Sequence, residues 1–231
     1  MLGLSLARMP YARARQYCYA SEMGMDAETR LQKTEEFARR GVVVLPNVVG
    51  DEALALIAQY MTLRIATKGM PEEVGGPGTL AAYADTVSES LLNLFTPFVA
   101  SLAGEEVVPS FSYLRVYREE QSLPAHVDRD ACVYTLTLAV MGKGAGKEWE
   151  ICCTCVDDSS LHHALKPGDG VLMRGREVLH WREPLSDGWA ALVFLHWADG
   201  SAPRESWYDG RVGVGHPSVR HQRTGTDALS A

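Results

Sequence analysis

The chain has 231 residues, of which 46% are hydrophobic and 22% are charged, and this composition predicts one globular domain with a full core. The formal net charge of -7 argues against a dominant surface for nucleic-acid phosphates, because such a surface needs clustered Lys and Arg. No apolar run approaches the roughly 20 residues that span a bilayer. We therefore expect a soluble, cytoplasmic protein without a nucleic-acid or membrane partner.

The first twenty residues are basic, with Arg8, Arg13 and Arg15 and no acidic residue. An organelle-targeting peptide would look similar. The segment is short and runs directly into Glu22 and Asp26, which favours a poorly ordered or packed terminal helix. Both interpretations stay open.

Five cysteines are present, and three of them crowd the sequence Cys152-Cys-Thr-Cys155. Adjacent cysteines on a strand point to opposite faces, which is poorly suited to a disulfide. The spacing lacks the second pair of a soft-metal site, so we interpret these residues as small apolar core residues on a strand. A reducing compartment fits best.

Residues 1–106 are predicted to form a helical buttress with one short strand. The expected helices cover residues 26–40, 52–66 and 86–102, and Leu31 and Phe37 are assigned to the buried face of the first. Gly41 is expected to end that helix, and Asp51 to cap the second. The short strand begins at Val42. Residues 69–78, rich in Gly and Pro, are expected to form a loop, either a substrate lid or an ordinary surface connection.

From Val107 onward the pattern changes to short strands separated by turns, which is typical of an all-β sandwich or barrel. The expected strands cover residues 111–118, 132–140, 148–156, 170–174, 177–181 and 189–197. We therefore predict a mainly β protein with α, a jelly roll (double-stranded β-helix, cupin-like) braced by the N-terminal helices. Residues 107–208 form its core in this prediction, and residues 209–231 form a loose tail.

Three side chains have the spacing of a metal site. His126 and Asp128 are two residues apart on a segment expected to be extended, so their side chains point to the same face. His180 follows 54 residues later, at the end of an apolar run that starts after the turn Lys166-Pro-Gly-Asp169. Two imidazoles and one carboxylate leave the opposite face of a metal open, as in non-haem iron(II) oxygenases.

Three motifs resemble one known family. They are Ser-Tyr-X-Arg-Val-Tyr at residues 112–117, His-X-Asp-Arg at 126–129 and His-Trp-Arg-Glu-Pro at 180–184. They resemble the iron(II)/2-oxoglutarate-dependent oxygenases of the double-stranded β-helix fold, in their prolyl-hydroxylase-like and phytanoyl-hydroxylase-like branches. The resemblance covers roughly residues 35–208, so the whole chain is predicted to be a single oxygenase domain.

The resemblance implies iron(II) held by His126, Asp128 and His180, with 2-oxoglutarate and dioxygen as co-substrates and a role for ascorbate left open. It implies oxidation, above all hydroxylation, of a C–H bond in a small molecule or a peptide side chain. Asp128 weighs against a halogenase, because halogenating relatives replace this carboxylate. A cupin-like metal-binding or sugar-binding jelly roll without redox turnover is the alternative.

The chain departs from the family at the cation for the 5-carboxylate of 2-oxoglutarate. Relatives commonly carry an Arg or Lys near ten residues after the distal His, whereas this chain has Ala190 there. The candidates that remain are Arg182, which shares the face of His180, then Arg115, and Arg174. The resemblance also implies that Tyr117, on the strand of Arg115, contacts 2-oxoglutarate. Each could instead be part of a structural ion pair.

Further polar residues were assigned from strand parity. Thr137, with Thr135, either lines the pocket or is a surface threonine of its strand. His196 either points into the barrel near the co-substrate or is a satisfied core histidine, which is the commoner case. Arg129 and Tyr117 are expected to orient the site. The remaining candidates receive structural roles: His162 and His163 as loop residues and Trp181 as core packing.

Overall fold

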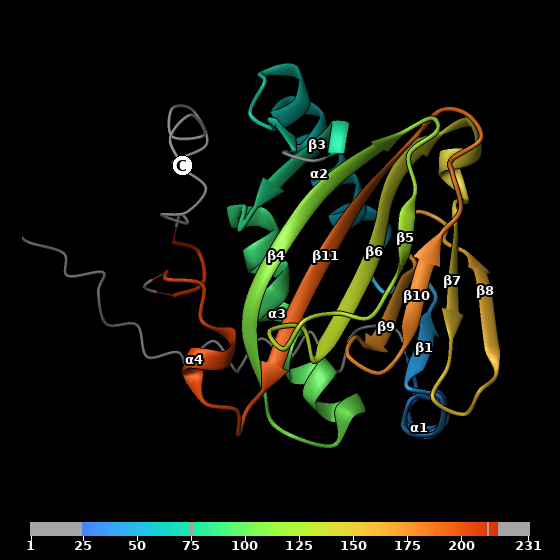
Figure 1. Ribbon diagram of the computed structural model, residues 1–231, viewed down its shortest axis with the longest axis vertical. Coiled ribbons are helices and arrows are strands. Elements are labelled where there is room, and N and C mark those ends of the chain that lie inside the picture. Colours follow the sequence, from blue (N-terminus) through green and yellow to red (C-terminus); the bar gives the residue numbers. More distant parts are fainter. Residues whose placement is uncertain (1–24, 74–75, 212, 217–231) are drawn as a thin grey trace, which may run out of the picture.

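The computed structural model describes residues 25–73, 76–211 and 213–216. Two antiparallel sheets face each other, as Figure 1 shows. The larger has the strand order β1-β9-β6-β11-β4-β3-β2 and the smaller has the order β5-β10-β7-β8. Their bounds are β1 Val42–Leu45, β2 Glu72–Glu73, β3 Gly76–Tyr83, β4 Val107–Arg118, β5 Leu123–His126, β6 Tyr134–Lys143, β7 Glu150–Thr154, β8 Ser160–Ala164, β9 Gly170–Arg174, β10 Leu179–Arg182 and β11 Trp189–Asp199.

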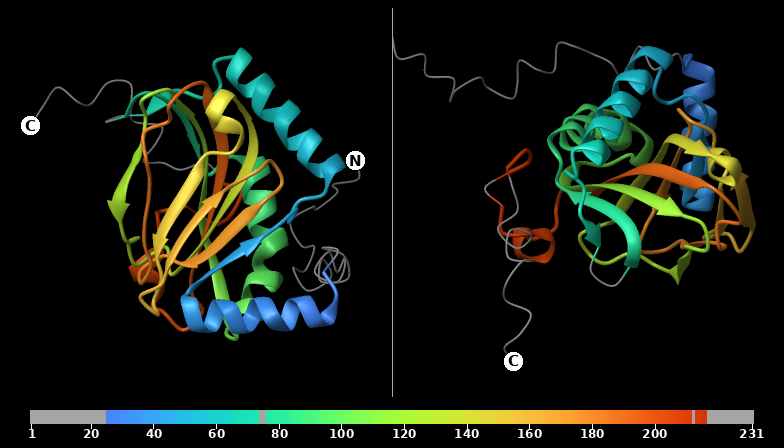
Figure 2. Two further views of the ribbon diagram at one scale, coloured as in Figure 1. Left: turned by 90° about the vertical axis from the view of Figure 1, so that its right-hand side faces the viewer. Right: turned by 90° about the horizontal axis from the view of Figure 1, so that it is seen from above.

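Four α-helices accompany the sheets in the described part of the chain: α1 Ala27–Arg40, α2 Asp51–Ala66, α3 Thr86–Ala103 and α4 Arg204–Trp207. Figure 2 shows that α2 and α3 cover the outer face of the seven-stranded sheet. The predicted jelly roll with a helical brace is therefore confirmed. No helix in the described ranges is both long and apolar enough to cross a membrane.

The alternation of side chains along the strands creates two cores. On β11, Val193, Leu195 and Trp197 pack against the helices, whereas Leu192 and Phe194 point to the smaller sheet. We call the space between the two sheets the inner core. Because successive residues of a strand face opposite sides, each long strand contributes to both cores.

Helix α1 ends where the sequence predicts. Asp26 caps its start by accepting a hydrogen bond from the Thr29 amide. Gly41 ends the helix with a φ of 70°, and its backbone N–H donates a hydrogen bond to the Phe37 carbonyl. Phe37 is buried as predicted, but Leu31 is 59% exposed, so its assignment to a buried face was wrong. The structure also places the start of α2 differently, because Gly50 is its N-cap and Asp51 is its first helical residue.

The N-terminal third contributes more to the sheets than predicted. Strand β1 pairs with β9 at one edge of the large sheet, and β3 pairs with β4 nearer the other. Residues 69–78 were predicted to be a loop, but β2 and the start of β3 lie there. The Gly and Pro content hid these strands, because both residue types are poor strand formers.

Two structural assignments in the smaller sheet were wrong. His162 and His163 lie on β8 and not in a loop, and β8 was missing from the predicted strands. Trp181 lies on the outer face of the sheet and donates a hydrogen bond to Glu183 Oε1, so it is not a core residue. The short, polar composition of β8 gave no apolar alternation to detect.

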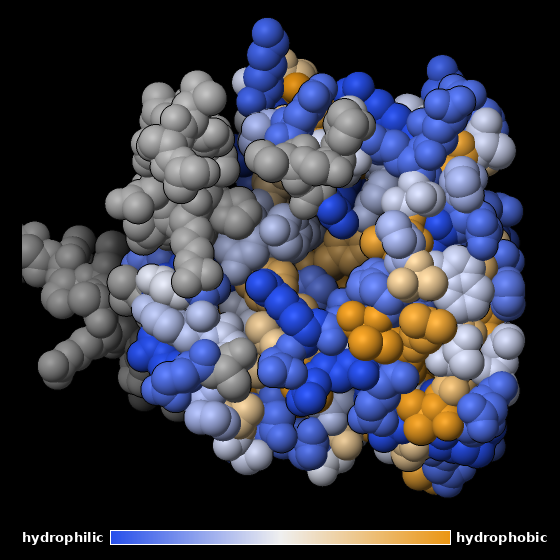
Figure 3. All heavy atoms as spheres, viewed as in Figure 1, coloured by the Kyte–Doolittle hydropathy of each residue, from blue (hydrophilic) through white to orange (hydrophobic). Residues whose placement is uncertain are grey.

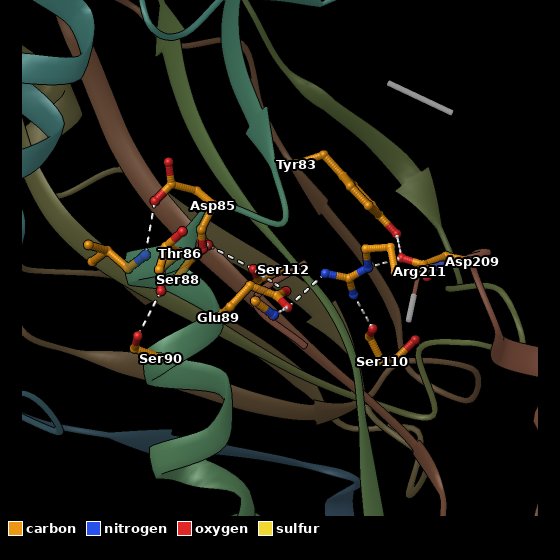
Figure 4. Close-up of polar contacts among 12 residues, drawn as sticks. Tyr83, Asp85, Thr86, Ser88, Glu89, Ser90, Ser110, Ser112, Asp209 and Arg211 are labelled. Carbon is orange, nitrogen blue, oxygen red and sulfur yellow. Dashed lines mark hydrogen bonds and ion pairs between the residues drawn. The ribbon is translucent and has the colours of Figure 1, made fainter. Parts of the chain in front are cut away.

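The chain after Tyr208 is anchored, and the predicted loose tail was wrong for the residues described there. Arg211 is 3% exposed and donates to Glu89 Oε2 on α3 at 2.7 Å and to the Ser110 carbonyl on β4. Asp209 pairs with Arg211 and accepts a hydrogen bond from Tyr83 (Figure 4). The predictions for residues 1–20, for Cys18 and for residues 217–231 lie outside the described part of the chain.

Candidate active site

The three predicted metal ligands converge. His126 on β5 lies directly across from His180 on β10, with 4.3 Å between the ring centroids. The Nε2 atoms of His126 and His180 lie 3.7 and 3.9 Å from Oδ1 of Asp128. Asp128 follows β5 and its amide donates to the Gly175 carbonyl at 2.7 Å, which turns the carboxylate toward the two rings. One ion can contact all three donor atoms.

The backbone sets the tautomer of both histidines. Nδ1 of His126 lies 2.7 Å from the Pro124 carbonyl oxygen, and Nδ1 of His180 lies 3.0 Å from that of Val178. A carbonyl only accepts, so each Nδ1 carries the hydrogen and each Nε2 presents its lone pair to the shared point. This is the orientation that metal-binding histidines adopt.

A buried hydroxyl orients Asp128. Thr135 on β6 donates from Oγ1 to Oδ2 of Asp128 at 2.6 Å, and the same hydroxyl lies 3.0 Å from Nδ1 of His196. Burial would raise the pKa of Asp128, but the contact with His126, the positive charges that His196 and His180 carry when protonated at low pH, and the Thr135 hydroxyl lower it to about 2. The ligand is therefore a carboxylate at neutral pH.

The imidazoles respond differently to their surroundings. The contact with Asp128 raises the pKa of His126, whereas burial lowers the pKa of His180. Burial lowers the pKa of His196 to about 4, so this ring is neutral beside the site. His196 is buried and its Nδ1 lies 3.0 Å from the Thr135 hydroxyl, as in the alternative of a satisfied core histidine.

Gly175 is a site residue that the sequence analysis missed. A Cβ at this position would overlap Oδ2 of Asp128 and would lie 2.6 Å from the Cys132 carbonyl oxygen. Only glycine leaves room for the carboxylate there. The available signal was its position in the turn just before the strand of His180.

Arg182 lies in the inner core, two residues beyond His180. Its side chain is 1% exposed, Nη1 donates to the Trp149 carbonyl at 2.6 Å, and the guanidinium carbon lies 4.9 Å from the Trp149 ring centroid. Nε and Nη2 have no hydrogen-bond partner among the described residues. Burial lowers the pKa of Arg182 to about 10, which leaves the side chain charged at neutral pH.

The predicted candidates on β4 lie near Arg182. Arg115 donates from Nη1 to the Tyr117 hydroxyl at 2.9 Å, and the Tyr117 ring packs 5.0 Å from that of Trp149. Thr137 is buried on β6, across from Phe194, a residue of the inner core. In Figure 3 the protein surface is hollowed between β4 and β5, with hydrophobic atoms in its depth.

Arg174 and Arg129 lie elsewhere. Arg174 sits across from Tyr134, a residue of the core between the large sheet and the helices, and its Nε lies 3.4 Å from Oε2 of Glu177. The structure thus does not bring Arg174 into the inner core. The Arg129 guanidinium stacks 4.6 Å from the Phe111 ring centroid, and that ring lies 4.5 Å from His196.

Solved structures share this fold. A Pseudomonas putida prolyl-4-hydroxylase superposes with a TM-score of 0.61 at 13% identity, covering 74% of this chain and 100% of that one. The epimerase SnoN in complex with Fe3+, alpha ketoglutarate and nogalamycin RO gives a TM-score of 0.65 at 13% identity, covering 84% and 94%. A Trichoplax adhaerens prolyl hydroxylase bound to a hypoxia inducible factor peptide fragment gives 0.59 at 10% identity, covering 77% and 96%.

No protein-family model matches the sequence, and no curated protein resembles it significantly. The solved structures nevertheless confirm, at the level of the fold, the predicted resemblance to the iron(II)/2-oxoglutarate-dependent oxygenases. The fold is that of a jelly-roll protein, and it brings together two histidines and one carboxylate that could hold a metal ion.

Proposed function

We propose that this protein is a non-haem iron(II) oxygenase that uses 2-oxoglutarate and dioxygen to oxidise a C–H bond of a small molecule or a peptide side chain. In the hydroxylation that we favour, one oxygen atom enters the substrate as C–OH and the other enters succinate, while carbon dioxide leaves. The observation that carries the proposal is the convergence of His126, Asp128 and His180.

The donor set suits iron(II). Both imidazoles present Nε2 lone pairs, the carboxylate is ionised, and three protein ligands leave positions for exogenous ligands. When bound, the iron would supply the redox centre at which dioxygen and 2-oxoglutarate react. The protein's part is to hold the ligands: Thr135 fixes the carboxylate of Asp128, and backbone carbonyls fix both rings.

Arg182 is proposed to bind the 5-carboxylate of 2-oxoglutarate. A buried guanidinium in which Nε and Nη2 have no hydrogen-bond partner is costly unless an anion accepts from these nitrogens. Arg182 lies two residues from His180 on the same face, about 6.6 Å along a strand, on the interior side. Arg115 and Tyr117 are proposed as further polar groups of this pocket, with Thr137 on its wall.

The absence of a cation at Ala190 favoured the rival cupin-like binding protein. The buried guanidinium of Arg182 supplies a cation at a different position on the barrel, which weakens that argument. Proteins of this fold are bound to a peptide fragment in one structure and to a small molecule in another, and we extend both classes to this chain.

The test is anaerobic addition of iron(II) and then 2-oxoglutarate to the metal-free protein. Bidentate chelation of iron by 2-oxoglutarate produces a visible charge-transfer absorption, so we expect a band that requires both additions and decays when oxygen is admitted, with release of succinate. Asp128→Ala should show neither the band nor succinate. A wild-type protein that binds iron but never develops the band would support the redox-silent jelly roll instead.

A further inference from the structure

A second group of metal-binding side chains lies on the outer face of the smaller sheet. Glu150 and Cys152 are two apart on β7 and share a face, and His162 on β8 lies directly across from Cys152. Cys153, the neighbour of Cys152, points the other way into the inner core. The sheet therefore separates this group, which we call the outer triad, from the interior.

The donor atoms of the outer triad converge on one point. Nδ1 of His162 lies 3.4 Å from Sγ of Cys152 and 3.4 Å from Oε2 of Glu150, and the sulfur lies 3.7 Å from the same oxygen. A nitrogen–oxygen hydrogen bond is normally about 2.7–3.2 Å, so the His162–Glu150 contact is long for one. Bond lengths to tetrahedral zinc place nitrogen, oxygen and sulfur donors about 3.3–3.6 Å apart. The two distances from His162 fall in this range, and the sulfur–oxygen distance of 3.7 Å is slightly longer.

The surroundings favour a cation. A cavity of about 140 Å³ beside Cys152 has Glu148, Glu150 and Glu183 in its lining, together with uncharged residues such as Trp149 and Leu185. The side chains of His162 and Glu150 are 53% and 50% exposed, whereas Cys152 is 1% exposed beneath them. An ion can thus approach from solvent between two accessible ligands and meet a thiol at the base of the site. Trp181 shields one side, with its ring perpendicular to that of His162.

We propose that Glu150, Cys152 and His162 bind one divalent ion of the zinc class, with water at the remaining position. Binding releases the thiol proton of Cys152 to solvent, since the thiolate is the ligand form. A thiolate and an imidazole select zinc and its borderline neighbours over the harder ions that carboxylates prefer. The ion would join β7 to β8, next to the strand that carries His180.

Cobalt(II) tests the proposal because only a sulfur ligand gives an intense thiolate-to-cobalt absorption in the near ultraviolet, and the ligands of the active site contain no sulfur. Metal-free full-length protein is titrated with cobalt(II) and then with zinc. We expect the absorption to saturate when one cobalt ion is bound at the outer triad of each protein molecule. It should disappear when zinc displaces cobalt. It should persist in His180→Ala, in which the active site is incomplete.

Matched variants locate the sulfur. Cys152→Ser should abolish the absorption, and His162→Ala, an exposed position, should weaken cobalt binding at least tenfold. His163→Ala, on the opposite face of the same strand, should leave it unchanged. Cys132→Ser is the critical control, because Cys132 lies near Asp128 and His196. Absence of the absorption in the wild-type protein, its survival in Cys152→Ser, or its loss in Cys132→Ser would each overturn the proposal.

Discussion

At the scale of single residues, hydrogen bonds from neighbouring side chains and backbone groups position the three proposed metal ligands. Asp128 is held on one side by the Thr135 hydroxyl and on the other by a backbone bond to the Gly175 carbonyl. The histidines are held by the carbonyls of Pro124 and Val178. Such supports keep the donor atoms in place without an ion, which reduces the cost of ordering them on binding.

Gly175→Ala should weaken metal binding at the active site by about 10–100-fold, the loss typical of disturbing a group that positions a ligand. The new methyl group would overlap the Asp128 carboxylate and displace it. Calorimetric titration with Mn²⁺ measures the loss. Gly50→Ala is the matched control, because no atom lies within 4 Å of its Cβ position. Equal affinities for the wild-type protein and Gly175→Ala would contradict this account.

Arg182→Gln should raise the dissociation constant of 2-oxoglutarate by about 10–100-fold, because one charge-assisted hydrogen bond contributes about 1.5–3 kcal/mol. Metal affinity should stay nearly unchanged, since no metal donor is altered. Anaerobic titration of the iron-loaded protein with 2-oxoglutarate gives both constants. If Arg182→Gln leaves the titration unaffected and Arg115→Gln abolishes it, the cation belongs to β4.

At the scale of elements, local sequence patterns decide where helices end and how strands alternate. Helices α1 and α3 both end at a glycine in the left-handed region, Gly41 and Gly104. The surroundings differ, because a Cβ at Gly41 would lie 2.7 Å from Val156 Cγ2, whereas nothing lies within 4 Å at Gly104. The left-handed backbone therefore favours glycine at both helix ends, and close packing excludes a side chain only at Gly41.

Gly41→Ala should destabilise the fold more than Gly104→Ala. Both variants incur the left-handed backbone cost of about 1–2 kcal/mol, and Gly41→Ala adds the clash with Val156. The midpoints of urea unfolding at equal slope report the difference. Equal destabilisation would mean that the contact between the end of α1 and the chain after β7 relaxes freely.

At the scale of the whole molecule, two long-range connections stand out. The C-terminal segment returns to α3 through Arg211 and Glu89, whose side chains are 3% and 1% exposed (Figure 4). Glu89 also accepts hydrogen bonds from Ser112 and from the Gly215 amide. The second connection is the proposed metal site, which joins β5, β10 and the turn that carries Gly175.

Arg211→Met should cost about 3–5 kcal/mol, because it leaves the Glu89 carboxylate buried without its charge partner. Replacing Glu89 by Gln in the same protein should recover part of the loss. Urea unfolding of both single variants and the double variant gives the coupling energy. Additive losses in the double variant would show that the two side chains do not act as a pair.

Mn²⁺ at 100 times its dissociation constant should stabilise the folded protein by about 2.7 kcal/mol. For a chain of this size, that raises Tm by roughly 5–10 °C. Mn²⁺ prefers oxygen and nitrogen donors to thiolate, so the shift reports the active site and not the outer triad. His180→Ala should show no shift at the same concentration. A full shift in that variant would place the stabilising ion elsewhere.

Local pattern was sufficient for much of this protein. Alternation in residues 132–140 and 189–197 predicted strands, Gly41 predicted a helix end, and the spacing of His126, Asp128 and His180 predicted the donors that the fold brings together. The strands, the helix end and the pair His126 and Asp128 depend on neighbours along the chain, where side-chain periodicity reports directly on backbone geometry. His180, 54 residues after His126, was added to the pair through the resemblance of the motifs to one family.

Tertiary structure alone decided the rest. The burial of Arg182 against Trp149, the closeness of Gly175 to Asp128, the anchoring of Arg211 by Glu89 and the outer triad all join residues that are far apart in sequence or on separate strands. Parity indicates which face a side chain takes within one strand. It does not say which strand lies next to it, because sheet order follows from the packing of the whole chain.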